Sequence, residues 1–151
     1  MSGQSPDGQA ENRATIQGSG FQFETTYTDL PQALHRFAEP SQAPSPKVTL
    51  LNAALAKELG LTLDNLSAEQ QAELLTGHTL AEGSVPFAQA YAGHQFGGFS
   101  ILGDGRAHVL GEHLTPSGQR VDVQLKGSGR TPFSRGGDGL ASLGPIWAKV
   151  E

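Results

Sequence analysis

Glycine dominates one part of the chain: 13 of the 52 residues from Gly93 to Gly144 are glycine. Glycine disfavours helix interiors, and it supplies the backbone conformations of tight turns that other residues avoid. We therefore expect this part to form short strands joined by turns. The whole chain has 151 residues, which suits one domain with a packed core.

Three segments of the glycine-rich part, 99–102, 107–111 and 121–126, read as strands. A Gly-Asp-Gly turn signal at 103–105 separates the first two, and Thr-Pro-Ser-Gly at 115–118 separates the last two. Apolar and polar residues alternate through 121–126, as they do on a half-buried strand. The pattern predicts an antiparallel meander of three strands.

The preceding residues predict helices and loops. Leu51, Leu55 and Leu59 recur at helical spacing within 50–59, and Gly60 is a plausible helix stop. Ser67 and Gln70 have the spacing of a capping box, which predicts a second helix up to about Leu75. We expect both helices to be structural.

The start of the chain is polar. Residues 1–20 are rich in Gly, Ser, Gln and Asn, which predicts a disordered tail. Prolines at 40, 44 and 46 predict an extended loop over 39–46. The expected organisation is a tail at 1–20, a helical extension at 21–90 and a strand-rich lobe at 91–151.

Composition excludes several classes of protein. The net charge of −5 argues against a nucleic-acid or membrane-surface protein, and no apolar run is long enough for a transmembrane helix. The chain has no cysteine, so disulfides and thiolate metal sites are excluded. The first 20 residues lack the apolar core of a secretory signal. We expect a cytoplasmic protein.

The order of elements matches that of a kinase amino-terminal lobe: a strand, Gly-x-Gly, a strand, a turn and a strand ending in Lys126. Amides of a glycine turn approach phosphate oxygens closely, and a strand lysine adds a positive charge. The residues alone leave a plainer reading open, in which 103–105 is an ordinary turn and Lys126 is a solvated charge.

The segment 126–139 strengthens the nucleotide interpretation. It places Lys126, Arg130 and Arg135 among five glycines, and half of the ten basic residues lie between Arg106 and Arg135. Such a loop can surround a polyphosphate, although a flexible loop with solvated arginines is the alternative.

Other candidate ligands are weaker. His94, His108 and His113 lack metal-ligand spacing, so we expect hydrogen-bonding or surface histidines. Asp104 and Asp138 could bind a metal, but aspartate is commoner as a turn residue.

Several ordered blocks resemble the selenoprotein O family over about residues 21–147. Asn52 and the Leu55 to Leu61 stretch also resemble that family's early helix. The blocks are Tyr-Ala-Gly-His-Gln-Phe-Gly at 91–97, Leu-Gly-Asp-Gly-Arg-Ala at 102–107, Leu-Gly-Glu at 110–112, Gln-Leu-Lys-Gly-Ser-Gly-Arg-Thr-Pro-Phe-Ser-Arg at 124–135 and Gly-Asp-Gly at 137–139.

The resemblance implies a protein-kinase-like fold, of the pseudokinase kind, that binds ATP in a flipped orientation. It implies transfer of AMP to Ser, Thr or Tyr hydroxyls of proteins, assisted by magnesium or manganese. Matched by motif, the nucleotide-binding positions are Gly103, Gly105, Arg106, Lys126, Asp138 and Gly139. The catalytic aspartate and the metal ligands of the family lie downstream, so no catalytic or metal residue is expected in this chain.

Two positions depart from the family pattern. The family continues Asp-Gly-Arg-Ala, whereas this chain has Leu140 in place of the arginine. By register, Lys149 stands where the family has the glutamate that pairs with the strand lysine, and residues 147–151 look like an altered tail. A lysine at 149 would repel Lys126.

The sequence thus predicts an α+β fold, with a small antiparallel sheet and flanking helices. It would be equivalent to a kinase amino-terminal lobe, truncated before the carboxy-terminal lobe. Three functions stay open: the ATP-binding part of a protein adenylyltransferase that is inactive by itself, a non-catalytic nucleotide- or protein-binding module, and a non-functional remnant.

Overall fold

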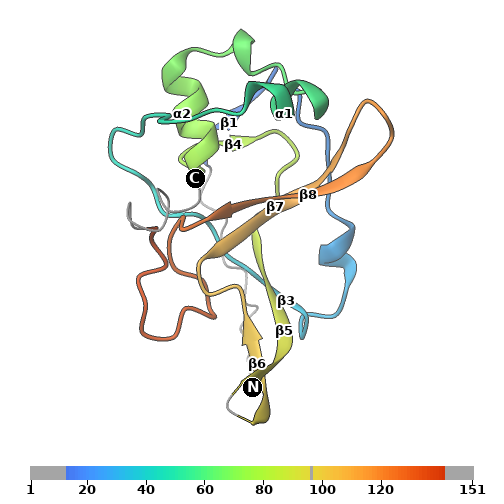
Figure 1. The fold of residues 1–151 in the computed structure, drawn as a ribbon, viewed down its shortest axis with the longest axis vertical. Helices are drawn as coiled ribbons and strands as arrows, with labels where there is room; N and C mark the ends of the chain where they lie inside the picture. Colours follow the sequence, from blue (N-terminus) through green and yellow to red (C-terminus); the bar gives the residue numbers. More distant parts are fainter. Residues whose placement is uncertain (1–12, 96, 142–151) are drawn as a thin grey trace, which may run out of the picture.

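The computed structural model describes residues 13–95 and 97–141 and shows an α+β fold with more sheet than helix (Figure 1). Its main sheet has six antiparallel strands, and its central strand β7 contacts three others. The strands of this sheet are β2 (Phe23–Glu24), β3 (His35–Phe37), β5 (Phe87–Gln95), β6 (Gly98–Gly103), β7 (Ala107–Leu114) and β8 (Arg120–Lys126).

The hairpin of β7 and β8 confirms the second half of the predicted meander. Residue 107 pairs with 126 and 114 with 120, and the turn at 115–118 closes with a hydrogen bond from Gly118 N to Thr115 O of 2.9 Å. Burial alternates along β8, with Val121, Val123 and Leu125 on the more buried face. The alternation in the sequence of β8 therefore predicts correctly which side chains lie on the more buried face.

The first half of the predicted meander, the pairing of 99–102 with 107–111, is wrong. Strand β6 pairs with 90–95 of β5, and β7 meets β5 further along, at Phe87. The segment 103–105 therefore joins two strands that both pair with β5 and not with each other. The sequence does not reveal this arrangement because alanine and glycine interrupt the apolar pattern of β5, which weakens its strand signal.

Part of the predicted tail also belongs to the fold. Strand β1 (Thr15–Ile16) pairs in parallel with β4 (Leu80–Ala81), and Ile16 is buried. The Arg13 guanidinium donates to Gly77 O at 2.6 Å and to Pro40 O at 2.8 Å. The prediction of disorder up to residue 20 is therefore wrong for 13–20, because hydrogen bonds to distant segments order these polar residues. Residues 1–12 lie outside the described residues.

Both helices form near the expected positions. Helix α1 (Ala53–Glu58) is capped by Asn52, and Gly60 follows its end with a positive φ. Helix α2 (Ala68–Thr76) begins with the complete capping box of Ser67 and Gln70 and ends at Gly77 in the left-handed conformation. The stretch 39–46 contains no helix or strand. Short 3-10 turns occupy Thr26–Asp29 and Leu63–Asn65.

Two apolar centres hold these elements. Ile16, Leu63, Leu74 and Ala81 form a buried cluster beneath the helices. On the sheet, Phe87 is 1% exposed, and its ring stacks on that of Tyr27 with the two centroids 5.1 Å apart, a favourable separation for an aromatic pair. The division of the chain at residue 90/91 stays a prediction, and β5 runs across that position.

Within the described ranges, no helix combines the length and the apolar character that crossing a membrane requires.

Candidate functional site

The site predicted from the sequence centres on a segment that we call the glycine loop, residues 127–141. The loop leaves the end of β8 and returns to its own start. Gly129 N donates to Gly139 O at 3.1 Å, and Ala141 N donates to Gly127 O at 3.0 Å. A bridge between Ser128 and Leu140 completes this closure. The loop is therefore fixed at its base by its own backbone.

The turn at 103–106 is joined to the glycine loop by hydroxyl groups. Thr131 Oγ1 donates to Asp104 O, and Ser134 Oγ donates to Gly105 O at 2.6 Å. Gly127 N also donates to Arg106 O at 2.6 Å, directly beside Lys126. Two segments that are more than 20 residues apart in sequence therefore form one structural unit.

Gly103 is required by close packing. A Cβ atom at this position would lie 2.4 Å from the Phe133 ring, a distance that real side chains do not reach. The Phe133 ring thus rests directly on the backbone of the turn. This contact explains a glycine at 103 without any ligand, and it places an aromatic side chain beside the predicted nucleotide turn.

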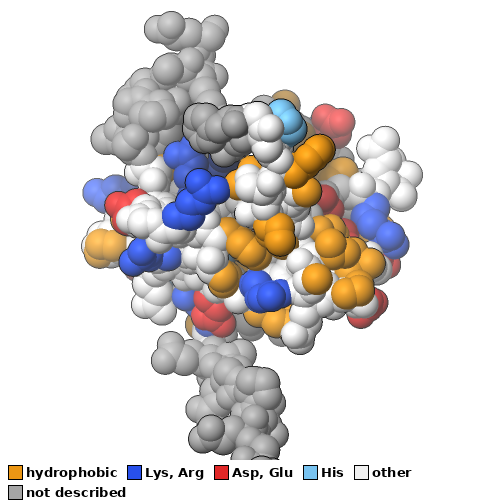
Figure 2. Space-filling model, turned by 90° about the horizontal axis from the view of Figure 1, so that it is seen from below, with side chains coloured by type: hydrophobic (Ala, Val, Ile, Leu, Met, Phe, Trp, Pro, Cys, Tyr) orange, Lys and Arg blue, Asp and Glu red, His pale blue; other side chains and the backbone are white. Residues whose placement is uncertain are grey.

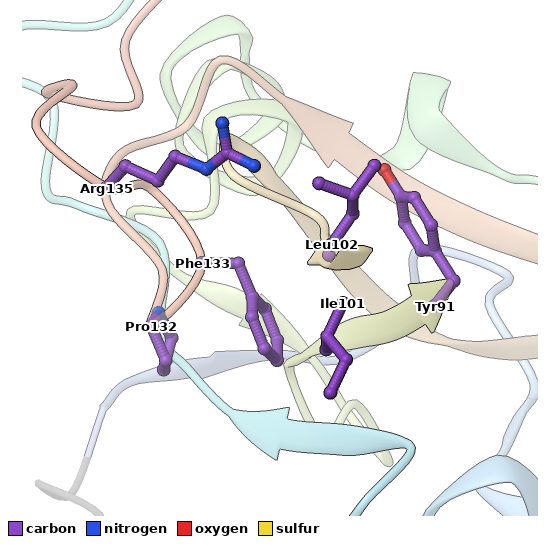
Figure 3. Close-up of a pocket in the computed structure, with 7 residues that line it drawn as sticks. Tyr91, Ile101, Leu102, Pro132, Phe133 and Arg135 are labelled. Carbon is purple, nitrogen blue, oxygen red and sulfur yellow. The ribbon is translucent and has the colours of Figure 1, made fainter. Parts of the chain in front are cut away.

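The six predicted residues do not share one cavity. Lys126 and Asp138 line a cavity of about 470 Å³ together with Arg130. Gly103 lines another, of about 440 Å³, with Arg135 (Figure 3). Gly105, Arg106 and Gly139 are not among the residues that line these two cavities. The glycine loop contributes to both cavities, so it connects the two halves of the predicted site.

Positive charge gathers around the loop. Arg106, Lys126, Arg130 and Arg135 are all exposed. Figure 2 shows Lys and Arg side chains beside hydrophobic ones on the face seen from below. An exposed cluster of cations next to apolar surface suits a ligand that is both anionic and partly apolar.

The two aspartates of the site accept backbone hydrogen bonds, Asp138 within its own turn and Asp104 from strand β5. Asp104 accepts a hydrogen bond from Gln89 N at 3.0 Å, and Asp138 accepts one from Leu140 N at 3.0 Å. Across the described ranges, no group of three or more His, Asp or Glu side chains is placed to hold a metal ion. Magnesium or manganese therefore has no ligand set among these residues.

Histidine positions agree with hydrogen-bonding or surface roles. His94 is exposed, whereas His108 and His113 are buried. His108 Nδ1 lies 2.7 Å from Ser128 Oγ, at the base of the glycine loop. Burial lowers the pKa of His108 below its ordinary value, and the Arg13 charge acts in the same direction. His108 is consequently a neutral support under the loop near pH 7.

Sequence reasoning missed the apolar wall of the site. Tyr91, Leu102 and Phe133 line the cavity at Gly103. All three lie within the family blocks, yet none of them is among the predicted nucleotide-binding positions. Arg135 also adopts a positive φ of 56°, which is uncommon for a residue with a side chain. Neither the hairpin pairing that exposes Tyr91 nor this backbone conformation has a local sequence signal. The predicted clash of Lys149 with Lys126 lies outside the described residues.

Comparison with known proteins agrees with these motifs. Residues 18–145 match the family described as protein adenylyltransferase SelO. A protein nucleotidyltransferase YdiU of Brevibacillus brevis is 52% identical over 136 residues, which cover 90% of this chain and 28% of the relative. Corresponding proteins of Anoxybacillus flavithermus and Nitrosococcus oceani are 54% and 52% identical, covering 85% and 86% of this chain.

The chain spans little more than a quarter of the length of these relatives, 28%, 27% and 26% respectively. The family match nevertheless covers the main sheet, the turn at 103–106 and the glycine loop. The chain therefore belongs to the SelO family of protein adenylyltransferases.

Proposed function

We propose that this chain is the ATP-binding part of a protein adenylyltransferase, built as a kinase-like amino-terminal lobe. The observation that carries the proposal is the joining of the 103–106 turn to the glycine loop next to Lys126. This unit presents four exposed cations and two glycine-rich backbone segments, which suit a polyphosphate. The family membership supports this reaction class.

In the proposed reaction, a protein hydroxyl oxygen bonds to the α-phosphorus of ATP. The bond from that phosphorus to the bridging oxygen breaks, pyrophosphate leaves and the hydroxyl proton passes to a base. Magnesium or manganese would neutralise the developing charge when bound. This chain's share of the work is to hold the triphosphate, through Lys126 and the arginines of the loop, and to restrict its orientation through the loop backbone.

Lys126→Ala tests the proposal. Removing a charge-assisted contact is worth about 1.5–3 kcal/mol when the contact is shielded, so we expect ATP affinity to fall at least about tenfold. Isothermal titration with ATP measures this directly. Lys57→Ala is the matched control, because Lys57 is an exposed lysine on α1, outside the site. Equal ATP affinity of the wild type and Lys126→Ala would contradict the assigned role.

A non-catalytic nucleotide-binding module is the second candidate, and Leu140 favours it. This residue lines the cavity of Lys126 and Asp138 at the position where the family pattern has an arginine. The resemblance also assigns the catalytic aspartate to the part of the relatives that lies beyond the matched segment. We therefore propose that the chain by itself binds ATP and leaves protein acceptors unmodified. We also propose a cytoplasmic location.

Labelled ATP tests whether the chain by itself transfers AMP. The purified chain is incubated with ATP labelled in its α-phosphate, with magnesium or manganese and with a protein acceptor such as casein. The binding module predicts incorporation equal to that of Lys126→Ala. Incorporation above that control would show catalysis by this chain and would overturn the non-catalytic candidate.

A further inference from the structure

The cavity beside Gly103 has two different walls. Pro132 and Phe133 of the glycine loop form one wall, and Tyr91, Ile101 and Leu102 of the β5–β6 hairpin form the other (Figure 3). Figure 3 shows the Arg135 side chain reaching over the opening beside Phe133. The cavity is therefore a slot with apolar side chains on both walls, with more polar than apolar surface exposed inside it and with one cation at its rim.

The apolar side chains of the hairpin wall are exposed to solvent. Ile101 is 85% exposed and Tyr91 is 49% exposed. Their strands are paired, with Tyr91 opposite Leu102, so these two side chains lie on one face of the hairpin and Ile101 lies on the other. The pairing holds this wall in place. The loop wall is held by the Phe133 contact with Gly103 and by the hydroxyl bonds of Thr131 and Ser134. Both walls are thus positioned without a ligand between them.

The chemistry of the slot suits the base of a nucleotide. A volume of about 440 Å³ lies within the range of small-molecule sites, about 300–1,000 Å³. An aromatic ring on one side and aliphatic side chains on the other accept a flat heterocycle by stacking and apolar contact. A guanidinium at the rim pairs with a phosphate attached to that heterocycle.

The backbone at Arg135 supports a ligand role for this residue. Its left-handed conformation, with φ of 56°, costs free energy for a residue with a Cβ atom. The neighbouring residues hold this conformation: Arg130 donates to Arg135 O at 3.4 Å, and Gly137 N donates to Ser134 O at 3.0 Å. The strained backbone accompanies a guanidinium that points toward the slot (Figure 3).

We propose that this slot binds the base of the nucleotide, stacked on Phe133 and covered by the β5–β6 hairpin, with Arg135 at its phosphate end. The inference rests on the proposed ATP binding and adds the location of the base. Lys126 lines the other cavity to which the glycine loop contributes, and the proposal places the phosphates along the loop between Arg135 and Lys126.

The test compares three probes in the 151-residue chain: ATP, adenosine and inorganic tripolyphosphate. Phe133→Leu keeps apolar volume on Gly103 and removes the aromatic face, and Ile101→Glu places a negative charge on the exposed wall. Stacking on an aromatic side chain is worth about 1–3 kcal/mol per base, so Phe133→Leu should weaken ATP and adenosine binding by about fivefold or more. Ile101→Glu should weaken both as well, because a charge replaces apolar surface against the base. Tripolyphosphate binding to Phe133→Leu should stay within about twofold of the wild type.

Phe99→Leu is the matched control, because Phe99 is an 85% exposed aromatic on the same hairpin and does not line the slot. Unchanged ATP affinity in Phe133→Leu and Ile101→Glu, together with a loss in Lys126→Ala, would overturn this inference and leave ATP binding standing. Equal losses of ATP and tripolyphosphate in Phe133→Leu would also overturn it. Absence of ATP binding by the wild type would overturn the proposed function and this inference together.

Discussion

Gly139 is the residue at which the predicted site depends most on glycine itself. Its φ is +71°, and a Cβ atom there would lie 1.9 Å from Gly129 O. Gly139→Ala must therefore break the closure of the glycine loop. We expect a loss of more than about 1 kcal/mol in the free energy of unfolding and weaker ATP binding.

Gly136→Ala is the control for that change, because it lies in the same loop with nothing within 4 Å of an added Cβ atom. Urea unfolding and ATP titration of the two variants measure the difference. If Gly139→Ala and Gly136→Ala had equal effects on both measurements, the closure at Gly129 would not matter to the loop.

At the same scale, the titration of His108 predicts how the stability of the folded chain depends on pH. Burial holds its pKa below the unfolded value of about 6.5, so the unfolded chain binds the proton more readily. The stability is complete above pH 6.5 and is lost as the pH falls below that value toward the folded pKa. The charges that bear on the ring come from Arg13, which lowers the pKa, and Asp104, which raises it, with Glu39 and Arg130 contributing through their backbone.

His108→Gln removes the titration and keeps a group that can hydrogen-bond to Ser128. Urea unfolding between pH 7.5 and 5.5 should therefore show a smaller loss of stability in the variant than in the wild type. Parallel pH profiles would mean that other groups cause the whole acid effect. The readout is a difference in slope, so a constant cost of the substitution does not obscure it.

At the scale of elements, the start of α2 offers the simplest test. Ser67 Oγ accepts from Gln70 N at 3.1 Å, and Gln70 Oε1 accepts from Ser67 N at 2.9 Å. Ser67→Ala should cost about 1 kcal/mol, as the loss of a helix cap usually does. Ser67→Asn should recover most of this, because asparagine is a good cap. Thermal unfolding distinguishes them, and equal destabilisation by both would exclude capping as the cause.

Elements with local signals were predictable from the sequence, and those defined by distant partners were not. The capping box predicted the start of α2, and the alternation of apolar and polar residues predicted β8. Both signals come from residues that are neighbours in the sequence. Strands β1, β2 and β3 are two or three residues long, and their partners lie 50 to 90 residues away. The same division holds at the site. Glycines and cations pointed to Lys126 and the glycine loop, whereas the slot of Tyr91 and Phe133 depends on hairpin pairing.

At the scale of the whole molecule, pairing between distant segments ties the chain together. Strand β2 pairs with β7, and Glu112 of β7 accepts hydrogen bonds from Thr26 N at 2.8 Å and Tyr27 N at 2.9 Å. His113 also contacts the backbone of Leu59, at the end of α1, with 2.7 Å between Nε2 and the carbonyl oxygen. The early residues are thus part of the structure that supports the glycine-rich site, so the site and the sheet should unfold together.

This arrangement predicts an order of protection in amide hydrogen exchange. Strand β7 lies between β8 on one side and β2 and β5 on the other, and residues 107–113 are buried. Among the described strands, β6 pairs only with β5, and Phe99 and Ile101 on it are 85% exposed. Amides that open only when the whole sheet unfolds exchange slowest, whereas an edge hairpin opens locally at a smaller cost in free energy.

We therefore expect the slowest exchange in β7 and its partner β8, and faster exchange in β6, measured by mass spectrometry of peptides covering 98–103 and 107–114. Saturating ATP should slow exchange in 98–103 more than in 107–114, because a base in the slot contacts Ile101 and Leu102 and must leave before the hairpin opens. Inorganic tripolyphosphate lacks a base and should leave exchange in 98–103 unchanged. Equal exchange rates in the two peptides without ligand would mean that β6 is as stable as the centre of the sheet, and the hairpin would then open only when the whole molecule unfolds.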